Sequence, residues 1–315
     1  MQALVIPEAG KPAVLTEIPT PLVGRQDVLV RVQASAVTGF DRLIATGALE
    51  EFMPHHYPIT VGREFTGTIT AVGAEVDGYQ VGDAVMGMIT GSDLHEGAVA
   101  EYVAVHADRH LAHRPANLTP VAAASVAMSA QVALAALEHI DPQAGQHVLI
   151  VGASGGVGMY ALQLAAARGA HIVATGRPGD EDILRAMGAG EVVDYEHDLP
   201  GTLERMRPQG FDALIDVATL DPGAFTTLSA RVRDGGRAAC STMLADPLAL
   251  AERDISAVNV MVDLAPGQPL QHITAMLTDG SLRPLPTHAT ALAHAEHVIA
   301  QLPHRHRPGR HVITF

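Results

Sequence analysis

The sequence predicts an α/β protein in which a β-rich domain is joined to a domain built on a parallel sheet. The first ~115 residues hold short runs of β-prone residues between glycine, proline and aspartate, a spacing typical of a β-rich domain. From His147 onward, short apolar strands alternate with longer helical stretches, which predicts a parallel sheet covered on both faces. The length of 315 residues is consistent with two domains.

The composition excludes several classes of protein. The chain has 20 Lys+Arg against 34 Asp+Glu and a net charge of −14, which argues against nucleic-acid binding. Its single cysteine, Cys240, cannot form an internal disulfide or a multi-cysteine zinc site, and is expected to be buried in an apolar strand. No leader-like segment opens the chain, and Val121–Leu137 is too polar for a membrane helix. These features predict a cytoplasmic protein that contacts no membrane.

In the β-rich part, the turn signals separate several strands that follow a first strand at the N-terminus. These strands are expected at Val28–Val32, Phe65–Val72, Ala84–Ile89 and Tyr102–Val105. One buried helix is expected over the alanine-rich stretch Val121–Leu137. Asn117 or Thr119 can cap this helix, and Pro120 fits its first turn.

In the second part, apolar runs mark the strands and amphipathic stretches mark the helices. Strands are expected at His147–Val151, His171–Thr175, Glu191–Tyr195, Asp212–Val217, Arg237–Cys240 and His311–Phe315. Helices are expected near Gly156–Arg168, Asp180–Met187, Gln271–Thr278 and Ala291–Leu302.

The strongest chemical signal is a glycine-rich turn between the first of these strands and its helix, with the sequence VLIVGASGGVG over residues 148–158. Glycines let the backbone turn tightly and approach a pyrophosphate, which the N–H groups at the helix start then bind. The usual fingerprint is G-x-G-x-x-G. Here Ala153 occupies its first position, although Gly152 just upstream can serve the turn. The expected dinucleotide contacts in this turn are Gly152, Ser154, Gly155, Gly156, Val157 and Gly158.

The same residues also match G-x-S-x-G, the nucleophile elbow of serine hydrolases, with Ser154 as nucleophile. Asp216 and one of several histidines would complete a triad. However, Gly158 has no role in an elbow, and a β-rich N-terminal region does not fit that fold. The substitution Ser154→Ala distinguishes the dinucleotide-binding turn from the nucleophile elbow, because a hydrolase would lose its activity and a dinucleotide enzyme would keep most of it.

The end of the second parallel strand bears on the choice of cofactor. NAD-binding proteins place an acidic residue about 20 positions after the glycines, on the ribose 2′-hydroxyl. Here that place holds Arg177, which would pair with a 2′-phosphate, and no carboxylate stands there to repel one. NADPH is therefore favoured over NADH, with Thr175 as a neighbouring contact. Asp180 and Glu181 are expected to begin the next helix.

Taken in this order, the motifs resemble the medium-chain dehydrogenase/reductase superfamily, and most of all its zinc-free quinone oxidoreductase-like branch. The resemblance extends over nearly the whole chain. It includes Asp27–Val32, Gly62–Gly67, Val81–Val85, Gly97–Val103 and the glycine turn. It implies a GroES-like β-rich catalytic domain formed by residues 1–117 and 263–315, and a Rossmann NADP(H)-binding domain over residues 118–262.

The sequence departs from the zinc-dependent members of this superfamily at their metal ligands. Thr38 stands where they carry a ligating cysteine, and Arg63 stands where they carry a histidine. The four cysteines of their structural zinc lobe are also absent from this sequence. We therefore expect no metal to polarise an alcohol oxygen.

Without a metal, the simplest chemistry is hydride addition to an acceptor that is already electron-poor, such as a quinone or an α,β-unsaturated carbonyl. Thr38 is a candidate donor to the resulting enolate oxygen, and water or Tyr57 would supply the final proton. Arg63 either pairs internally with Glu64 or Asp41, or makes the substrate pocket electropositive. Asp41 is expected to cap a short helix.

Further contacts are implied by the resemblance. The cofactor contacts implied are Ser129, Tyr195, Val217, Ala218 and Arg310. The quinone oxidoreductases often form homodimers through the strand that closes the nucleotide domain, here Ala257–Val262.

Other functions stay open at this stage. The nearest alternative is an enoyl-thioester reductase or a polyketide-tailoring reductase, and one of another class is an NADPH-binding protein with little catalysis. His294, His297, His304 and His306 suggest a metal site, but without a carboxylate or cysteine they are better explained as surface histidines.

Overall fold

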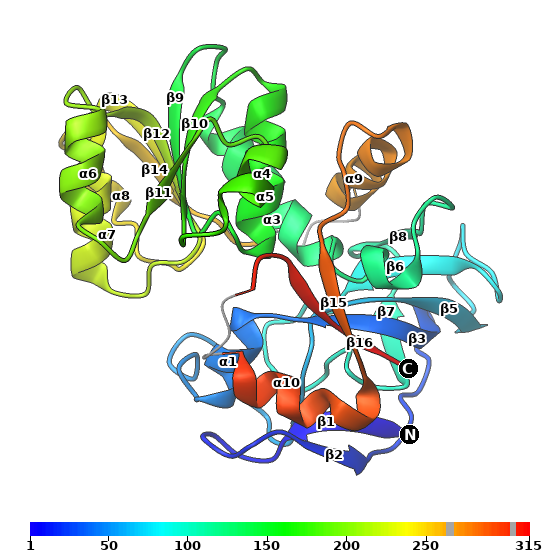
Figure 1. The fold of residues 1–315 in the computed structure, drawn as a ribbon. Helices are drawn as coiled ribbons and strands as arrows, with labels where there is room; N and C mark the ends of the chain where they lie inside the picture. The colour runs from blue at the N-terminus through cyan, green and yellow to red at the C-terminus, as the bar shows by residue number, and fades with distance from the viewer. Residues whose placement is uncertain (263–267, 303–306) are drawn as a thin grey trace. The chain divides into compact units, whose positions relative to one another are not determined.

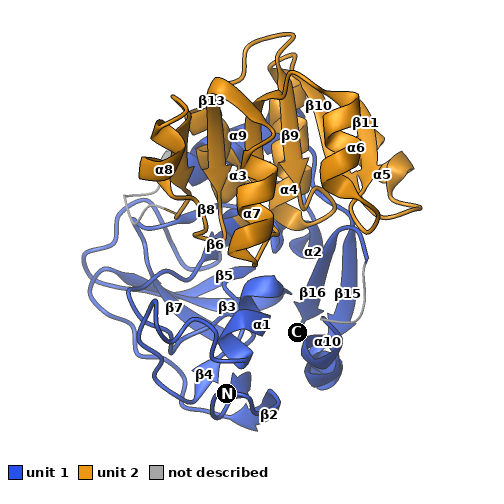
Figure 2. Ribbon diagram, turned by 90° about the vertical axis from the view of Figure 1, so that its left-hand side faces the viewer, with its two compact units in different colours: residues 1–128, 263–315 blue, residues 129–262 orange. Residues whose placement is uncertain are grey.

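The computed structural model describes residues 1–262, 268–302 and 307–315, which form two compact units (Figure 2). Unit 1 comprises Met1–Met128 and Asp263–Phe315, and unit 2 comprises Ser129–Val262. The mixed α/β fold predicted from the sequence is confirmed. The domain boundary expected after residue 117 lies instead between Met128 and Ser129.

Unit 2 is built on a six-stranded sheet with the order β11-β10-β9-β12-β13-β14, and all its strands are parallel. The strands are β9 (His147–Val151), β10 (His171–Gly176), β11 (Glu191–Asp194), β12 (Phe211–Asp216), β13 (Val232–Cys240) and β14 (Ser256–Asn259). The strand order reverses beside β9, and ligands of such doubly wound sheets bind at this point, beyond the carboxyl ends of the strands.

Helices cover both faces of this sheet. They are α3 (Ala127–Ile140), α4 (Gly156–Ala167), α5 (Glu181–Ala186), α6 (Leu199–Met206), α7 (Pro222–Ser229) and α8 (Pro247–Ala251). Figure 1 shows α4 and α5 on one side of the sheet and α6 and α7 on the other. Leu149 of β9 and Leu214 of β12 pack in one core cluster with Leu203 of α6 and Phe225 of α7. This double coverage explains why the central strand β9 is apolar and buried from Val148 to Val151.

Unit 1 contains two sheets. The smaller one has the order β2-β1-β4, and the larger has seven strands, with the order β15-β16-β3-β5-β6-β8 and β7 paired with β3. The strands are β1 (Gln2–Ile6), β2 (Val14–Glu17), β3 (Asp27–Val37), β4 (Ile59–Thr60), β5 (Glu64–Val72), β6 (Ala84–Met88), β7 (Tyr102–His106), β8 (Leu111–His113), β15 (Thr287–Ala291) and β16 (Arg310–Thr314). Because β16 pairs with β3, the C-terminal segment of unit 1 shares a sheet with strands of its N-terminal segment.

The helices of unit 1 are short. They are α1 (Gly39–Ala45), α2 (Pro120–Ala123), α9 (Gln268–Asp279), α10 (Ala295–Gln301) and a 3₁₀ turn at Leu292–His294. The last helix is shorter than expected because Ala291 still belongs to β15. Among the described residues, no helix has both the length and the apolar character needed to cross a bilayer.

The single helix expected over Val121–Leu137 is wrong, because the chain forms α2 and α3 with a break between them. Thr119 is the N-cap of α2 and accepts from the Ala122 N–H. Ser125 donates to the Ala122 carbonyl oxygen within the break, and such side-chain bonds compete with helix continuation. Because α2 packs on β3 and β5, it belongs to unit 1, which explains the later boundary.

Candidate active site

The glycine turn of unit 2 has the geometry of a dinucleotide-binding turn. Gly152 has a φ of +81°, in the left-handed region that favours glycine, and its N–H donates to Thr175 Oγ1 at 3.0 Å. A Cβ on Gly152 would lie 2.6 Å from the Cβ of Ala218. A Cβ on Gly158 would lie 2.3 Å from the Gly152 carbonyl oxygen, so α4 packs directly on the turn. Gly152 therefore takes the turn position that Ala153 leaves vacant in the fingerprint.

The start of α4 is open to a ligand. Gly155 is its N-cap, and no side chain caps its first N–H groups. A Cβ on Gly155 would meet only the Gly152 carbonyl oxygen, at 3.4 Å. Gly156 is buried and Val157 is half-buried in the first turn of this helix. Uncapped N–H groups at the positive end of a 12-residue helix, beside open space, suit a pyrophosphate.

The same geometry disfavours the nucleophile elbow. Ser154 is half-buried and is not among the residues with positive φ, whereas an elbow holds its serine in a strained turn. One oxygen of Asp216, Oδ1, accepts from the Ala218 and Thr219 N–H groups at 3.1 and 3.0 Å. The Asp216 carboxylate thus organises the loop after β12.

The structure brings three of the predicted cofactor residues together around this turn. Ala218 touches Gly152, Thr175 accepts from Gly152, and the Val217 N–H donates to the Val151 carbonyl oxygen at 3.1 Å. Ser129 is fully buried near the start of α3.

Arg177 follows β10 directly and has two side-chain partners. Its guanidinium carbon lies 5.7 Å from the centroid of the Tyr195 ring, and its Nε lies 2.9 Å from Glu196 Oε1. The expectation that no carboxylate lies at this place is therefore wrong. Glu196 follows the neighbouring strand β11, so the sequence alone did not show that it lies beside Arg177. Asp180 is the N-cap residue of α5, and its Oδ2 accepts from the Arg177 N–H at 2.9 Å.

In unit 1, the side chains of Thr38 and Asp41 are hydrogen-bonded to each other. Thr38 is the N-cap of α1, with its Oγ1 accepting from the Phe40 N–H at 3.0 Å and lying 3.2 Å from Asp41 Oδ2, to which it donates. The Asp41 carboxylate also accepts from the Thr38 and Gly62 N–H groups, each at 2.7 Å. Burial raises the pKa of Asp41, and these hydrogen bonds oppose the shift. Asp41 thus completes a capping box from helix position N3, with Thr38 as the N-cap itself.

Arg63 is 5% exposed and donates from Nη1 to the Glu96 carbonyl oxygen at 2.8 Å. Burial lowers its pKa, and the nearby Asp41 carboxylate opposes this shift. The option of a pair with Glu64 is wrong, because the Glu64 carboxylate is ion-paired with Arg310 of β16. Arg310, expected near the cofactor, is thus buried within unit 1 in that pair.

The Tyr57 hydroxyl donates to Glu50 Oε1 at 3.0 Å. Partial burial and the Glu50 carboxylate raise the pKa of Tyr57, which makes it a weaker acid. Its ring packs against the core of unit 1.

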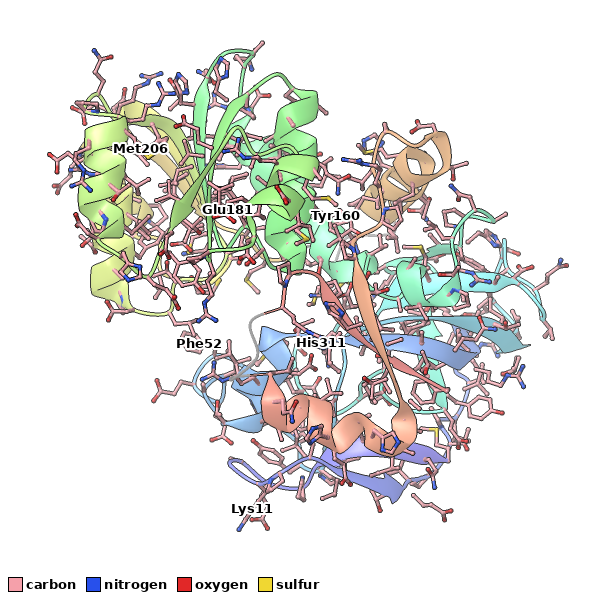
Figure 3. All side chains as sticks on the ribbon, in the orientation of Figure 1. Lys11, Phe52, Tyr160, Glu181, Met206 and His311 are labelled. Carbon is pink, nitrogen blue, oxygen red and sulfur yellow. The ribbon has the colours of Figure 1, made fainter. Side chains whose placement is uncertain are left out.

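Two of the histidines considered as metal ligands, His304 and His306, lie outside the described residues. His294 and His297 line a cavity of ≈ 140 Å³ together with His288 and His311, the last of which is marked on β16 in Figure 3. Within the part of the chain that the structure describes, no three histidine, cysteine or acidic side chains are grouped as a metal ion would require.

Comparison with known proteins agrees with this architecture. The family model for the alcohol dehydrogenase GroES-like domain matches residues 24–116, and the model for the zinc-binding dehydrogenase matches residues 156–263. A chloroplastic quinone oxidoreductase of Triphysaria versicolor is 25% identical over 94% of this chain and 92% of its own. A mitochondrial NAD(P)H oxidoreductase of Mus musculus is 31% identical over 62% of this chain and 54% of its own.

A solved structure supports the same assignment. An alcohol dehydrogenase superfamily protein from Novosphingobium aromaticivorans superposes with a TM-score of 0.84 and 28% identity, over 100% of this chain and 99% of that one. The fold and the glycine turn define a nicotinamide-linked oxidoreductase with a GroES-like and a Rossmann domain. The chain belongs to the medium-chain dehydrogenase/reductase superfamily and is quinone oxidoreductase-like, as its motifs predicted.

Proposed function

We propose that this oxidoreductase uses NADPH to reduce quinones or α,β-unsaturated carbonyl compounds, without a zinc ion. The observation that supports the proposal is the set of hydrogen bonds made by Thr38 and Arg63, which occupy the positions of metal ligands in zinc-dependent relatives. Thr38 caps α1, and Arg63 donates to the Glu96 carbonyl oxygen. Neither side chain carries a thiolate, an imidazole or a carboxylate, which are the side-chain groups that bind zinc in proteins. The quinone oxidoreductase named among the relatives supports the substrate class.

The chain's own residues would hold the cofactor and the acceptor. The open N-terminus of α4 binds the pyrophosphate, and Arg177 with Tyr195 binds the 2′-phosphate. NADPH, when bound, supplies a hydride from its nicotinamide ring. The hydroxyl of Thr38 turns from Asp41 to the acceptor oxygen and stabilises the negative charge there, while Asp41 stays held by the Thr38 and Gly62 N–H groups.

The final proton comes from water in this proposal. The hydroxyl proton of Tyr57 is already donated to Glu50, and the raised pKa of Tyr57 makes its release harder. Arg63 keeps a positive charge in the buried part of unit 1, where it favours electron-rich acceptor oxygens.

The proposal is tested with purified protein, NADPH, and a panel of quinones, enones and enoyl thioesters. We expect acceptor-dependent loss of NADPH absorbance with quinones or enones, unchanged by a metal chelator. Turnover restricted to enoyl thioesters would favour the thioester-reductase alternative. Binding of NADPH with no turnover on any acceptor would favour the binding protein with little catalysis. Loss of activity on chelation would overturn the metal-free chemistry.

We extend the proposal to a cytoplasmic homodimer. The single cysteine is buried, as suits a protein of a reducing compartment. Among the described strands of the six-stranded sheet, β14 is at one edge, and Met261 just beyond it is 70% exposed. An edge strand with adjoining apolar surface is suited to pairing with a second copy.

A further inference from the structure

The guanidinium group of Arg177 is already paired with a carboxylate. Arg177 follows β10 and Glu196 lies just beyond β11, and the register of these parallel strands sets Gly176 opposite Asp194. The two chain segments therefore leave the sheet side by side, with Arg177 Nε 2.9 Å from Glu196 Oε1. The side chains are 39% and 43% exposed, so both are open to a ligand and to solvent.

We infer that Glu196 is the residue that limits the preference of this protein for NADPH over NADH. The inference rests on the proposed dinucleotide site. A 2′-phosphate carries more than one negative charge at neutral pH and must share Arg177 with the Glu196 carboxylate. A ribose 2′-hydroxyl carries no charge and can donate to a carboxylate, as in NAD-binding proteins. Glu196 therefore weakens NADPH binding and leaves NADH binding unharmed.

The neighbouring acidic groups have other partners. Asp194 accepts from the Glu196 N–H at 2.9 Å and from His197 at 2.6 Å, which lowers the pKa of Asp194. Asp180 Oδ2 accepts a hydrogen bond from the main-chain N–H of Arg177 at 2.9 Å, and not from its guanidinium group. Of these carboxylates, Glu196 is the one that contacts the guanidinium group, at Nε, so it is the one with which a 2′-phosphate must share Arg177.

The inference is tested by substituting Glu196 and measuring binding rather than turnover. Isothermal titration of the full-length protein with NADPH, NADH, 2′,5′-ADP and 5′-ADP gives the four dissociation constants. For Glu196→Gln we expect NADPH and 2′,5′-ADP to bind up to about fivefold more tightly, since a surface charge contact contributes at most about 1 kcal/mol. The affinities for NADH and 5′-ADP should stay within about twofold or fall. The gain should shrink as salt is added.

Two further variants sharpen the result. In Arg177→Met the preference for the 2′-phosphate should be lost, and adding Glu196→Gln to that variant should then give no gain, because the pair acts as a unit. Glu204→Gln is the matched control. Glu204 lies on α6 of the same unit, in an exposed pair with Arg231 at 3.3 Å, and its loss should change neither affinity.

The outcomes separate this inference from the proposed function. If the unmodified protein binds the dinucleotides but Glu196→Gln leaves the ratio of the NADH and NADPH constants unchanged, Glu196 has no such role and the proposed function stands. If the unmodified protein binds none of the four ligands, the proposed function falls and the inference falls with it.

Discussion

Glu64 and Arg310 are ion-paired in the interior of unit 1, although 246 positions separate them in the chain. The pair joins β5 to β16, and a second oxygen of Glu64, Oε2, accepts from the Met128 N–H at 2.8 Å. The Glu64 carboxylate therefore connects β5, β16 and the end of the segment Met1–Met128. The exposed fractions of the two side chains are 0% and 7%, so neither charge is solvated.

Because the pair is buried, removing one partner should be strongly destabilising. We expect Arg310→Met to lower the free energy of unfolding by about 3–5 kcal/mol, since it leaves the Glu64 charge uncompensated. Urea denaturation followed by circular dichroism measures the change. Glu75→Gln is the control, because Glu75 and Arg25 form an exposed pair whose loss should cost no more than about 1 kcal/mol. Equal effects of the two substitutions would contradict this account of the Glu64–Arg310 pair.

Two glycines of the turn should respond differently to alanine. In Gly158→Ala the new Cβ would meet the Gly152 backbone, so we expect about 1–3 kcal/mol of destabilisation. In Gly155→Ala the new Cβ meets only one atom at 3.4 Å, so stability should fall by less than about 1 kcal/mol. That methyl group would still stand at the open end of α4, so dinucleotide affinity should be lost. Thermal denaturation and titration with NADPH distinguish the two effects, and unimpaired binding by Gly155→Ala would place the pyrophosphate elsewhere.

The pKa of Asp41 leads to a prediction about pH. Burial raises this pKa above its usual 3.8, so between the unfolded and folded values the folded protein holds more protons than the unfolded chain. The contribution of Asp41 to stability is therefore largest at acid pH and falls as pH rises through this window. Asp41→Asn should be less stable than the unmodified protein, with the largest deficit near pH 4.

The control for this experiment is Asp279→Asn, because hydrogen bonds from Ser281 lower the pKa of Asp279. Its contribution is present above pH 3.8 and is lost as pH falls below that value. Denaturant midpoints measured from about pH 3 to pH 8 should thus show opposite trends for the two aspartates. A pH-independent deficit for Asp41→Asn would mean that folding does not shift the pKa of Asp41.

The edge position of β14 leads to a prediction about assembly. We expect a dimer by sedimentation at micromolar concentration, and Met261→Arg should convert it to a monomer with an unchanged circular dichroism spectrum. Leu248→Arg is the control, since Leu248 is 84% exposed on α8 of the same unit. A monomer for the unmodified protein would overturn the proposed dimer.

The sequence predicted best those features that depend on local pattern. The strands β9, β10 and β12 were expected within a residue of their observed bounds, because apolar runs between turns are a local signal. Gly152 was expected to serve the turn after an apolar strand, and its φ of +81° is one that such a turn requires.

Features that depend on chain segments from distant places could not be predicted. Glu196 contacts Arg177 because two parallel strands end side by side. Glu64 forms its ion pair with Arg310 rather than with its neighbour Arg63, because β16 pairs with β3 in the seven-stranded sheet. The break between α2 and α3 was missed for a different reason. Both halves are helical by composition, and the break depends on the packing of α2 on β3 and β5 and on the hydrogen bond from Ser125 to the Ala122 carbonyl oxygen.

The nesting of unit 2 within unit 1 has a consequence for synthesis on the ribosome. Residues 129–262 are synthesised before β15 and β16, so unit 2 can begin to fold while unit 1 still lacks two strands. During that interval the Ala34–Val37 segment of β3 has not yet received its partner His311–Thr314. An unpaired strand edge invites association with other chains. The arrival of β16 therefore completes the pairing of β3 and ends the period in which this strand edge is open to other chains.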